Sequence, residues 1–273
     1  TVGNTGGSNL TWTIAEEPMS APRAVQSTAP ALPKADRAAA NKAGDALAQL
    51  AASTSGQPMT VPAPLAGLAA ENPDSLVSLV VDDGTYEDSI GLTNQVTNNA
   101  AVWLNRFTPT SDYPFQLEEI QVLWPDAASS LINLVGQPVT LLVYTDTDGN
   151  GNPANATLVA QQTFTIMVQG SAFDVYTLTT PVTLSGPGDV VIGFRDDWNL
   201  GGQTPANFPT AIDTTASAQR SWVAGNGTNG VDPDINNLGN NEIIGLIDDF
   251  GLPGNWTIRG YGNTSAQAEC TNL

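Results

Sequence analysis

The alternation of apolar and polar residues along the chain predicts a protein built from short β-strands. From residue 76 onwards, apolar residues recur at every second position or in short runs, separated by glycine, proline and asparagine. A period of two between such turn residues is typical of strands. Ten strands are expected, at 76–81, 101–107, 115–124, 139–144, 158–168, 173–178, 190–194, 220–223, 243–247 and 256–261. This series predicts an all-β, jelly-roll-type β-sandwich as the body of the protein, residues 76–262.

One of these strands carries an irregularity. Phe115 and Leu117 lie on one face of the strand by simple alternation. The apolar residues of 120–124 fall on that same face only if the alternation slips by one residue at Glu118 and Glu119. The sequence therefore predicts a β-bulge at this point.

The first eighteen residues form a segment of their own. Residues 1–18 contain a glycine-rich turn, followed by Leu10, Trp12 and Ile14 alternating with threonines. This pattern predicts a half-buried strand. Its three apolar side chains demand burial, and we expect the strand to complete a sheet of another subunit or of an adjoining repeat.

Residues 19–75 differ sharply in composition, being rich in alanine, proline and serine. We expect a linker-like arm with one short helix over residues 36–52, where Leu47 and Leu50 form a narrow apolar stripe. Residues 263–273 are expected to form a C-terminal tail.

Composition limits the chemistry of the chain. It has no histidine and one cysteine, Cys270, so the commonest general base and metal-binding nitrogen are missing. This counts against a hydrolase or an electron-transfer protein, and we expect no enzymatic activity. No apolar stretch is long enough to predict a membrane span.

Charge is distributed unevenly. The formal net charge is -19, and residues 71–273 carry all of it. Such a body repels nucleic acid and anionic lipid, and it attracts divalent cations or a basic partner. The nearest basic partner is the chain's own segment 23–42, with a net charge of about +3 from Arg23, Lys34, Arg37 and Lys42 against one acid.

Several segments resemble domains of large secreted proteins of environmental, Chloroflexi-like bacteria. The opening VGNTGGSNLTWTI and the closing AECTNL are similar to parts of immunoglobulin-like repeats. Five segments between them are similar to jelly-roll surface domains: DDGTYE at 82–87, VYTDTDGNGNP at 143–153, FDVYTLTTPVTLSGPGDVVIGF at 173–194, AIDTTASAQRSW at 211–222 and GNWTIRGYG at 254–262. The resemblance implies secretion, a β-sandwich and modular linkage, and it implies no catalytic residues.

The sharpest chemical motif places oxygen-bearing side chains at every second position of one loop. Asp146, Asp148, Asn150 and Asn152 alternate with Thr147 and two glycines. Hard oxygen ligands in this spacing are typical of a loop that wraps Ca²⁺. The same residues also favour an ordinary hairpin turn, and the distal glutamate of an EF-hand is missing. Calcium and a plain turn both stay open.

Other charged and aromatic residues allow two interpretations each. The four arginines of the body are expected to pair with acids along the sheets: Arg106, Arg195, Arg220 and Arg259. Trp198 and Trp222 are the candidates for stacking on a sugar, whereas the tryptophans at 12, 103, 124 and 256 are expected in the core.

Two functions are therefore weighed. The first is a structural subunit of an extracellular filament, sheath or surface layer, which assembles with copies of itself by β-strand complementation. The alternative is a carbohydrate-binding or adhesive module of a large secreted protein, with glycans as its partners. Both interpretations place the chain outside the cell or on its surface.

Overall fold

The computed structural model describes residues 76–92, 99–109, 112–170, 172–199, 207–226 and 231–264, and the backbone of two short strands at 24–25 and 50–53. The elements follow the chain in this order: β1 (Ala24–Val25), β2 (Leu50–Ser53), β3 (Leu76–Leu79), β4 (Asp88–Leu92), β5 (Asn99–Phe107), β6 (Phe115–Leu123), α2 (Ala127–Ser130), β7 (Pro138–Asp146), the 3-10 helix η4 (Pro153–Asn155), β8 (Thr157–Thr165), β9 (Phe173–Leu184), β10 (Asp189–Asn199), β11 (Thr210–Asp213), β12 (Ser221–Gly225), η5 (Leu238–Asn240), β13 (Ile243–Leu246), η6 (Ile247–Phe250), β14 (Asn255–Trp256) and β15 (Ile258–Thr264).

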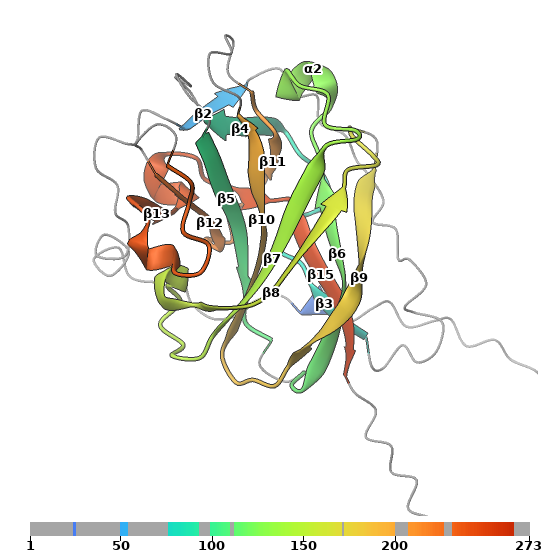
Figure 1. Ribbon diagram of the computed structural model, residues 1–273, viewed down its shortest axis with the longest axis vertical. Coiled ribbons are helices and arrows are strands. Elements are labelled where there is room, and N and C mark those ends of the chain that lie inside the picture. The colour runs from blue at the N-terminus through green and yellow to red at the C-terminus, as the bar shows by residue number, and fades with distance from the viewer. Residues whose placement is uncertain are drawn as a thin grey trace, which may run out of the picture.

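The strands form three sheets (Figure 1). A five-stranded sheet has the order β1-β3-β15-β6-β9, and a six-stranded sheet has the order β13-β12-β5-β10-β7-β8. A four-stranded sheet, β14-β11-β4-β2, completes the fold. All pairings are antiparallel except that of β1 with β3. The prediction of an all-β sandwich is confirmed.

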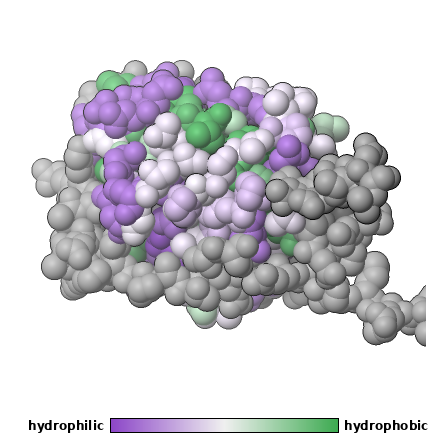
Figure 2. Space-filling view, turned by 90° about the horizontal axis from the view of Figure 1, so that it is seen from below, coloured by the Kyte–Doolittle hydropathy of each residue, from purple (hydrophilic) through white to green (hydrophobic). Residues whose placement is uncertain are grey.

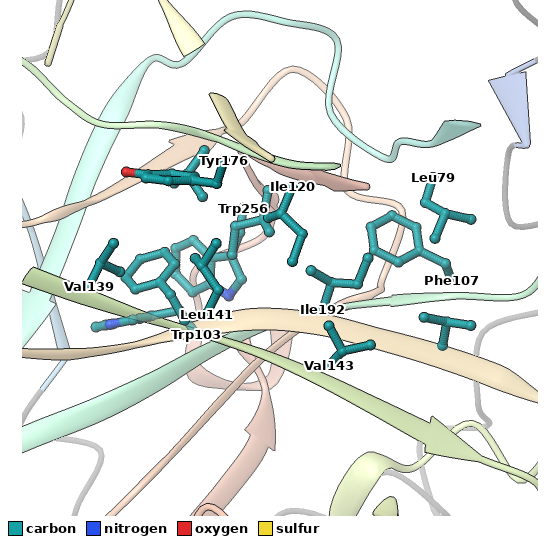
Figure 3. Close-up of a cluster of buried hydrophobic side chains, with 14 of the residues drawn as sticks. Leu79, Trp103, Phe107, Ile120, Val139, Leu141, Val143, Tyr176, Ile192 and Trp256 are labelled. Atoms are coloured by element: carbon teal, nitrogen blue, oxygen red, sulfur yellow. The ribbon is translucent and has the colours of Figure 1, made fainter. Parts of the chain in front are cut away.

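The main core lies between the five-stranded and the six-stranded sheets. Figure 3 shows Leu79 and Ile120 of one sheet facing Leu141 and Ile192 of the other. Alternate residues of each strand point into this layer, as a period of two requires. The tryptophans at 103, 124 and 256 are buried here, as expected from the sequence.

The six-stranded sheet buries its outer face as well. A second cluster contains Val102, Leu142, Val191 and Trp222, which point away from the main core. Residues of the 3-10 helices η4 and η5 and of their flanks pack in this cluster: Ala154, Ala156, Ile235 and Leu238. Because both faces of its central strands are apolar, these strands are nearly continuous hydrophobic runs.

The predicted strands agree with the observed ones. All ten overlap strands of the structure, and the register shift between Leu117 and Glu119 confirms the predicted bulge. Within the body, the strands β4 and β11 were not predicted. The body also ends later than expected, because β15 continues to Thr264.

The arm contributes two strands to the body. Ala24–Val25 runs parallel to β3, and Leu50–Ser53 pairs with β4. The prediction of a helix that reaches residue 52 is therefore wrong at its end, where pairing with the edge of β4 overrides the helical preference of alanine. The rest of that helix, residues 36–49, lies outside the described residues.

One face of the body is shown in Figure 2, where the molecule is viewed from below. The coloured residues of this face are mostly hydrophilic or intermediate in hydropathy, with smaller hydrophobic areas between them. None of the helices in the described ranges is long and apolar enough to cross a membrane.

Candidate functional site

The loop after β7 contains the predicted cation-binding residues, and their side chains organise its backbone. Oδ1 of Asp148 accepts a hydrogen bond from the Asn150 amide at 2.9 Å, and Oδ1 of Asn150 accepts one from the Asn152 amide at 2.6 Å. Asn152 caps η4 by accepting from the Ala154 amide at 3.0 Å. Each side chain therefore folds onto the backbone two residues further along, which coils the loop tightly.

Glycine makes this coil possible. Gly149 and Gly151 have φ angles of +67° and +75°, a region that side-chain-bearing residues rarely adopt. The alternation of oxygen-bearing residues with glycine therefore has a direct conformational reason in this loop.

The two aspartates of the loop differ in environment. Asp148 is exposed, and its Oδ2 accepts from the side-chain amides of Asn150 and Asn155, both at 2.6 Å. Asp146 is only 2 % exposed, and its Oδ2 is buried without a hydrogen-bond partner. Burial, together with the neighbouring Asp148 carboxylate, raises the pKa of Asp146 to about 6.

A charged cluster lies under the loop, at the ends of the strands of the six-stranded sheet. Asp189, the register partner of Asp146, accepts from Arg106 Nη1 at 2.6 Å and from Thr108 Oγ1 at 2.5 Å. Arg220 Nη1 donates to Thr108 Oγ1 at 3.1 Å. The loop packs on this cluster, because a Cβ added to Gly151 would lie 3.4 Å from the Arg106 guanidinium.

The donor atoms of this region are oxygens. Within the described ranges no group of three or more histidine, cysteine, aspartate or glutamate side chains could hold a metal ion. The loop offers two carboxylates, two amide oxygens and its own carbonyls instead. Such a donor set suits a hard cation and not a transition metal.

Three of the four arginines of the body form ion pairs with acids, as predicted: Arg106, Arg195 and Arg259. Arg259 binds both oxygens of Asp82 and stacks over the ring of Phe173, with its Cζ 4.2 Å from the ring centroid. Arg195 Nε bonds Asp197 at 2.7 Å. Asp82 is therefore paired with an arginine, and its role is structural.

The predicted stacking residues do not form a binding surface. Trp198 is 4 % exposed, packs on Trp124 and donates to the Pro138 carbonyl at 2.9 Å. Trp222 is 1 % exposed and belongs to the second core. Both indole rings are covered, so the prediction that they stack on a ligand is wrong.

The adjacent acids Asp196 and Asp197 lie in different environments. In β10, Asp196 is fully buried, whereas the side chain of Asp197 is 48 % exposed. Adjacent residues of a strand point to opposite sides, which separates the two carboxylates. Sequence reasoning missed the Trp103 indole, which donates to Asp196 Oδ2 at 2.6 Å inside the core.

Two edge strands border a groove on one side of the sandwich. Residues 159–162 of β8 and 179–183 of β9 line a groove of about 390 Å³. Gln162 links the two edges, since its amide donates to the Thr180 carbonyl and accepts from Thr179. Within the described ranges, β8 pairs with β7 alone and its other edge is free.

The predicted assembly residues lie outside the described residues. They are Leu10, Trp12, Ile14, Arg23, Lys34, Arg37 and Lys42.

Comparison with known proteins adds a likeness of fold alone. No protein-family model matches the sequence, and no curated protein matches it. One solved structure is similar, that of the cysteine protease and lectin-like domains of Cwp84, a surface layer associated protein of Clostridium difficile. The TM-score is 0.43 at 15 % identity, over 70 % of this chain and 36 % of that chain. At this level the likeness carries no functional conclusion.

Proposed function

We propose that the chain is a non-enzymatic structural subunit of an extracellular filament, sheath or surface layer, joined to its neighbours by β-strand complementation. The free edge of β8 carries this proposal. β8 is nine residues long, TLVAQQTFT, and contains no charge, proline or glycine. An unpaired edge of this length and composition is a template for another strand.

The other sheet edges are poor templates. The edge strands β1, β2, β13 and β14 are two to four residues long. The long edge strand β9 contains Pro181, which lacks an amide donor and interrupts a ladder of hydrogen bonds. β8 is therefore the edge that the described part of the chain leaves unguarded.

The segment best suited to this edge is the N-terminal strand of a second copy. Residues 8–14, SNLTWTI, are uncharged and alternate between apolar and polar positions, as a pairing strand does. Burying Leu10, Trp12 and Ile14 would contribute roughly 1.5–3 kcal/mol each before the cost of ordering the segment. The arm of residues 19–75 gives this strand the reach to leave its own body.

The arm also favours association by charge. Its segment 23–42 carries a net charge of about +3, which should attract the strongly negative body of the same copy or of a neighbour. The alternative of a carbohydrate-binding module is weaker, because its two stacking tryptophans are buried.

Charged residues on β8 test the proposal. In the test variant, Gln161→Lys and Thr163→Lys place two lysines at exposed positions of β8, the proposed acceptor edge. In the control variant, Thr177→Lys and Thr183→Lys do the same on β9. We expect the β8 pair, and deletion of residues 1–18, to abolish assembly measured by light scattering and electron microscopy. The β9 pair should assemble like the wild type.

Two results would contradict the proposal. One is normal assembly by the deleted chain. The other is equal loss of assembly in both lysine pairs, which would point to a general effect of the added lysines and not to pairing at β8. A glycan array with the monomeric deletion variant then tests the binding-module alternative.

A further inference from the structure

We propose that the loop of residues 146–152 binds one Ca²⁺ ion through side-chain oxygens of Asp146, Asp148 and Asn150 and through loop carbonyls. This inference is independent of the assembly proposal, because it concerns a site within one copy. It rests on two observations, the alternating oxygen donors of the loop and the buried, unpartnered Oδ2 of Asp146.

A plain turn accounts for the first observation and not for the second. The loop around Asp234 is a useful comparison, because this residue also organises a turn. Its Oδ1 accepts from the amides of Asn236 and Asn237, its Oδ2 accepts from Asn240, and it remains partly exposed. Every oxygen of that carboxylate is used. A turn therefore needs no buried acid with a free oxygen.

Asp146 departs from this arrangement in two ways, because it is buried and one of its oxygens is without a partner. Its Oδ1 accepts a long hydrogen bond, of 3.4 Å, from the amide of Asp148, which is a second acid. Two neighbouring carboxylates repel each other, and burial increases the repulsion. A divalent cation between them would remove both costs.

The nearest ion pair of this region does not include Asp146. Arg106 forms its ion pair with Asp189, the register partner of Asp146, at 2.6 Å. A second guanidinium, that of Arg220, donates to Thr108 at 3.1 Å in the same cluster. Asp146 lies beside the pair of Arg106 and Asp189 on the same face of the sheet.

The donor set favours calcium over other divalent cations. Its ligands are all oxygens, which excludes a preference for zinc or copper. The side chains and carbonyls of a coiled loop give the flexible geometry of six to eight ligands that Ca²⁺ accepts, whereas Mg²⁺ demands near-ideal octahedral geometry.

Calcium binding to the full-length protein tests the site. We expect chelator-treated protein to bind one Ca²⁺ per chain in calorimetry, with a Kd on the order of 10⁻⁴–10⁻³ M, as in extracellular modules. Tb³⁺ offers a second readout, because Tyr144 lies two residues before Asp146 and can sensitise its luminescence. Mg²⁺ at the same concentration should not displace Tb³⁺.

Matched variants separate this site from general charge effects. Asp148→Asn should weaken Ca²⁺ binding at least tenfold and abolish the rise in melting temperature that Ca²⁺ gives the wild type. Asn150→Ala, which keeps both carboxylates, should weaken binding as well. Asp234→Asn removes one acid from the comparison turn and should bind like the wild type.

Three results would overturn the inference. The first is an equal melting temperature of the wild-type protein in chelator and in 10 mM Ca²⁺, a concentration on the order of ten times the weakest expected Kd. The second is Asp148→Asn with unchanged affinity, and the third is equal weakening in Asp234→Asn. Circular dichroism of each variant shows that the fold is kept.

Discussion

Asp196 should make the stability of the protein fall as pH rises. Its carboxyl group is fully buried and accepts a hydrogen bond from Trp103 Nε1 at 2.6 Å. Burial, with a smaller contribution from the charge of Asp197, raises the pKa of Asp196 to about 7. In the unfolded chain an aspartate has a pKa of about 3.9.

The sign follows from proton binding. Between pH 4 and pH 7 the folded protein keeps the proton on Asp196, whereas the unfolded chain has lost it. The contribution of this group to stability is therefore fully present below pH 4 and is lost as pH rises towards 7. Each pH unit is worth about 1.4 kcal/mol, so the loss over this window is on the order of 4 kcal/mol.

The variant Asp196→Asn isolates this contribution. It keeps an oxygen for the Trp103 indole but has no titrating proton. We expect the free energy of unfolding of the wild type, relative to this variant, to fall by about 4 kcal/mol between pH 4 and pH 8. Urea denaturation at one-unit pH intervals measures it.

The neighbouring residue supplies a control. Asp197→Asn changes a side chain that is 48 % exposed, and it should keep most of the wild-type pH dependence. A difference between wild type and Asp196→Asn that stays constant within about 1 kcal/mol from pH 4 to pH 8 would refute the reasoning.

Two further substitutions test the packing of the sandwich. Arg259→Leu leaves Asp82 buried without its partner and should lower the free energy of unfolding, measured by urea denaturation, by about 3–5 kcal/mol. A loss below about 1 kcal/mol would show that the ion pair is dispensable. Gly193→Ala would place a Cβ 2.0 Å from the Trp103 carbonyl oxygen and should lower the free energy of unfolding by about 3 kcal/mol or prevent folding. The control Gly225→Ala places its Cβ 3.5 Å from the nearest atom, the Ala100 carbonyl oxygen, and should have nearly wild-type stability in the same assay.

Strands with a regular pattern could be predicted from the sequence, because one buried face imposes a period of two. The bulge in β6 was found for the same reason, since the apolar face changes phase there. β4 and β11 lacked such a pattern. Both strands are short; β4 begins with Asp88 and β11 ends with Asp213. The two strands pair with each other. Pairing between distant segments leaves no periodic trace in either one.

The candidate site was predicted only in part. The alternating oxygens of the cation loop are local in sequence and could be read directly. The Asp189 carboxylate beside Asp146 could not, because strand register brings them together across more than forty residues. The wrong role given to Trp222 has a similar cause, since residues such as Leu238 and Leu246 cover its face from a distant segment.

The proposed cation loop and the proposed acceptor edge belong to one hairpin. The loop leads through η4 directly into Thr157, the first residue of β8, and the register of β8 against β7 shifts between Val143 and Tyr144, close to the loop. A cation that fixes the loop would also fix the start of β8. The edge would then lose less conformational freedom when another strand pairs with it. Calcium should then strengthen assembly. Thermodynamic linkage makes the effect reciprocal, so assembled protein should bind calcium more tightly than free subunits do. The lysine pair on β8 leaves the loop intact, so it should abolish assembly while single subunits bind calcium as before.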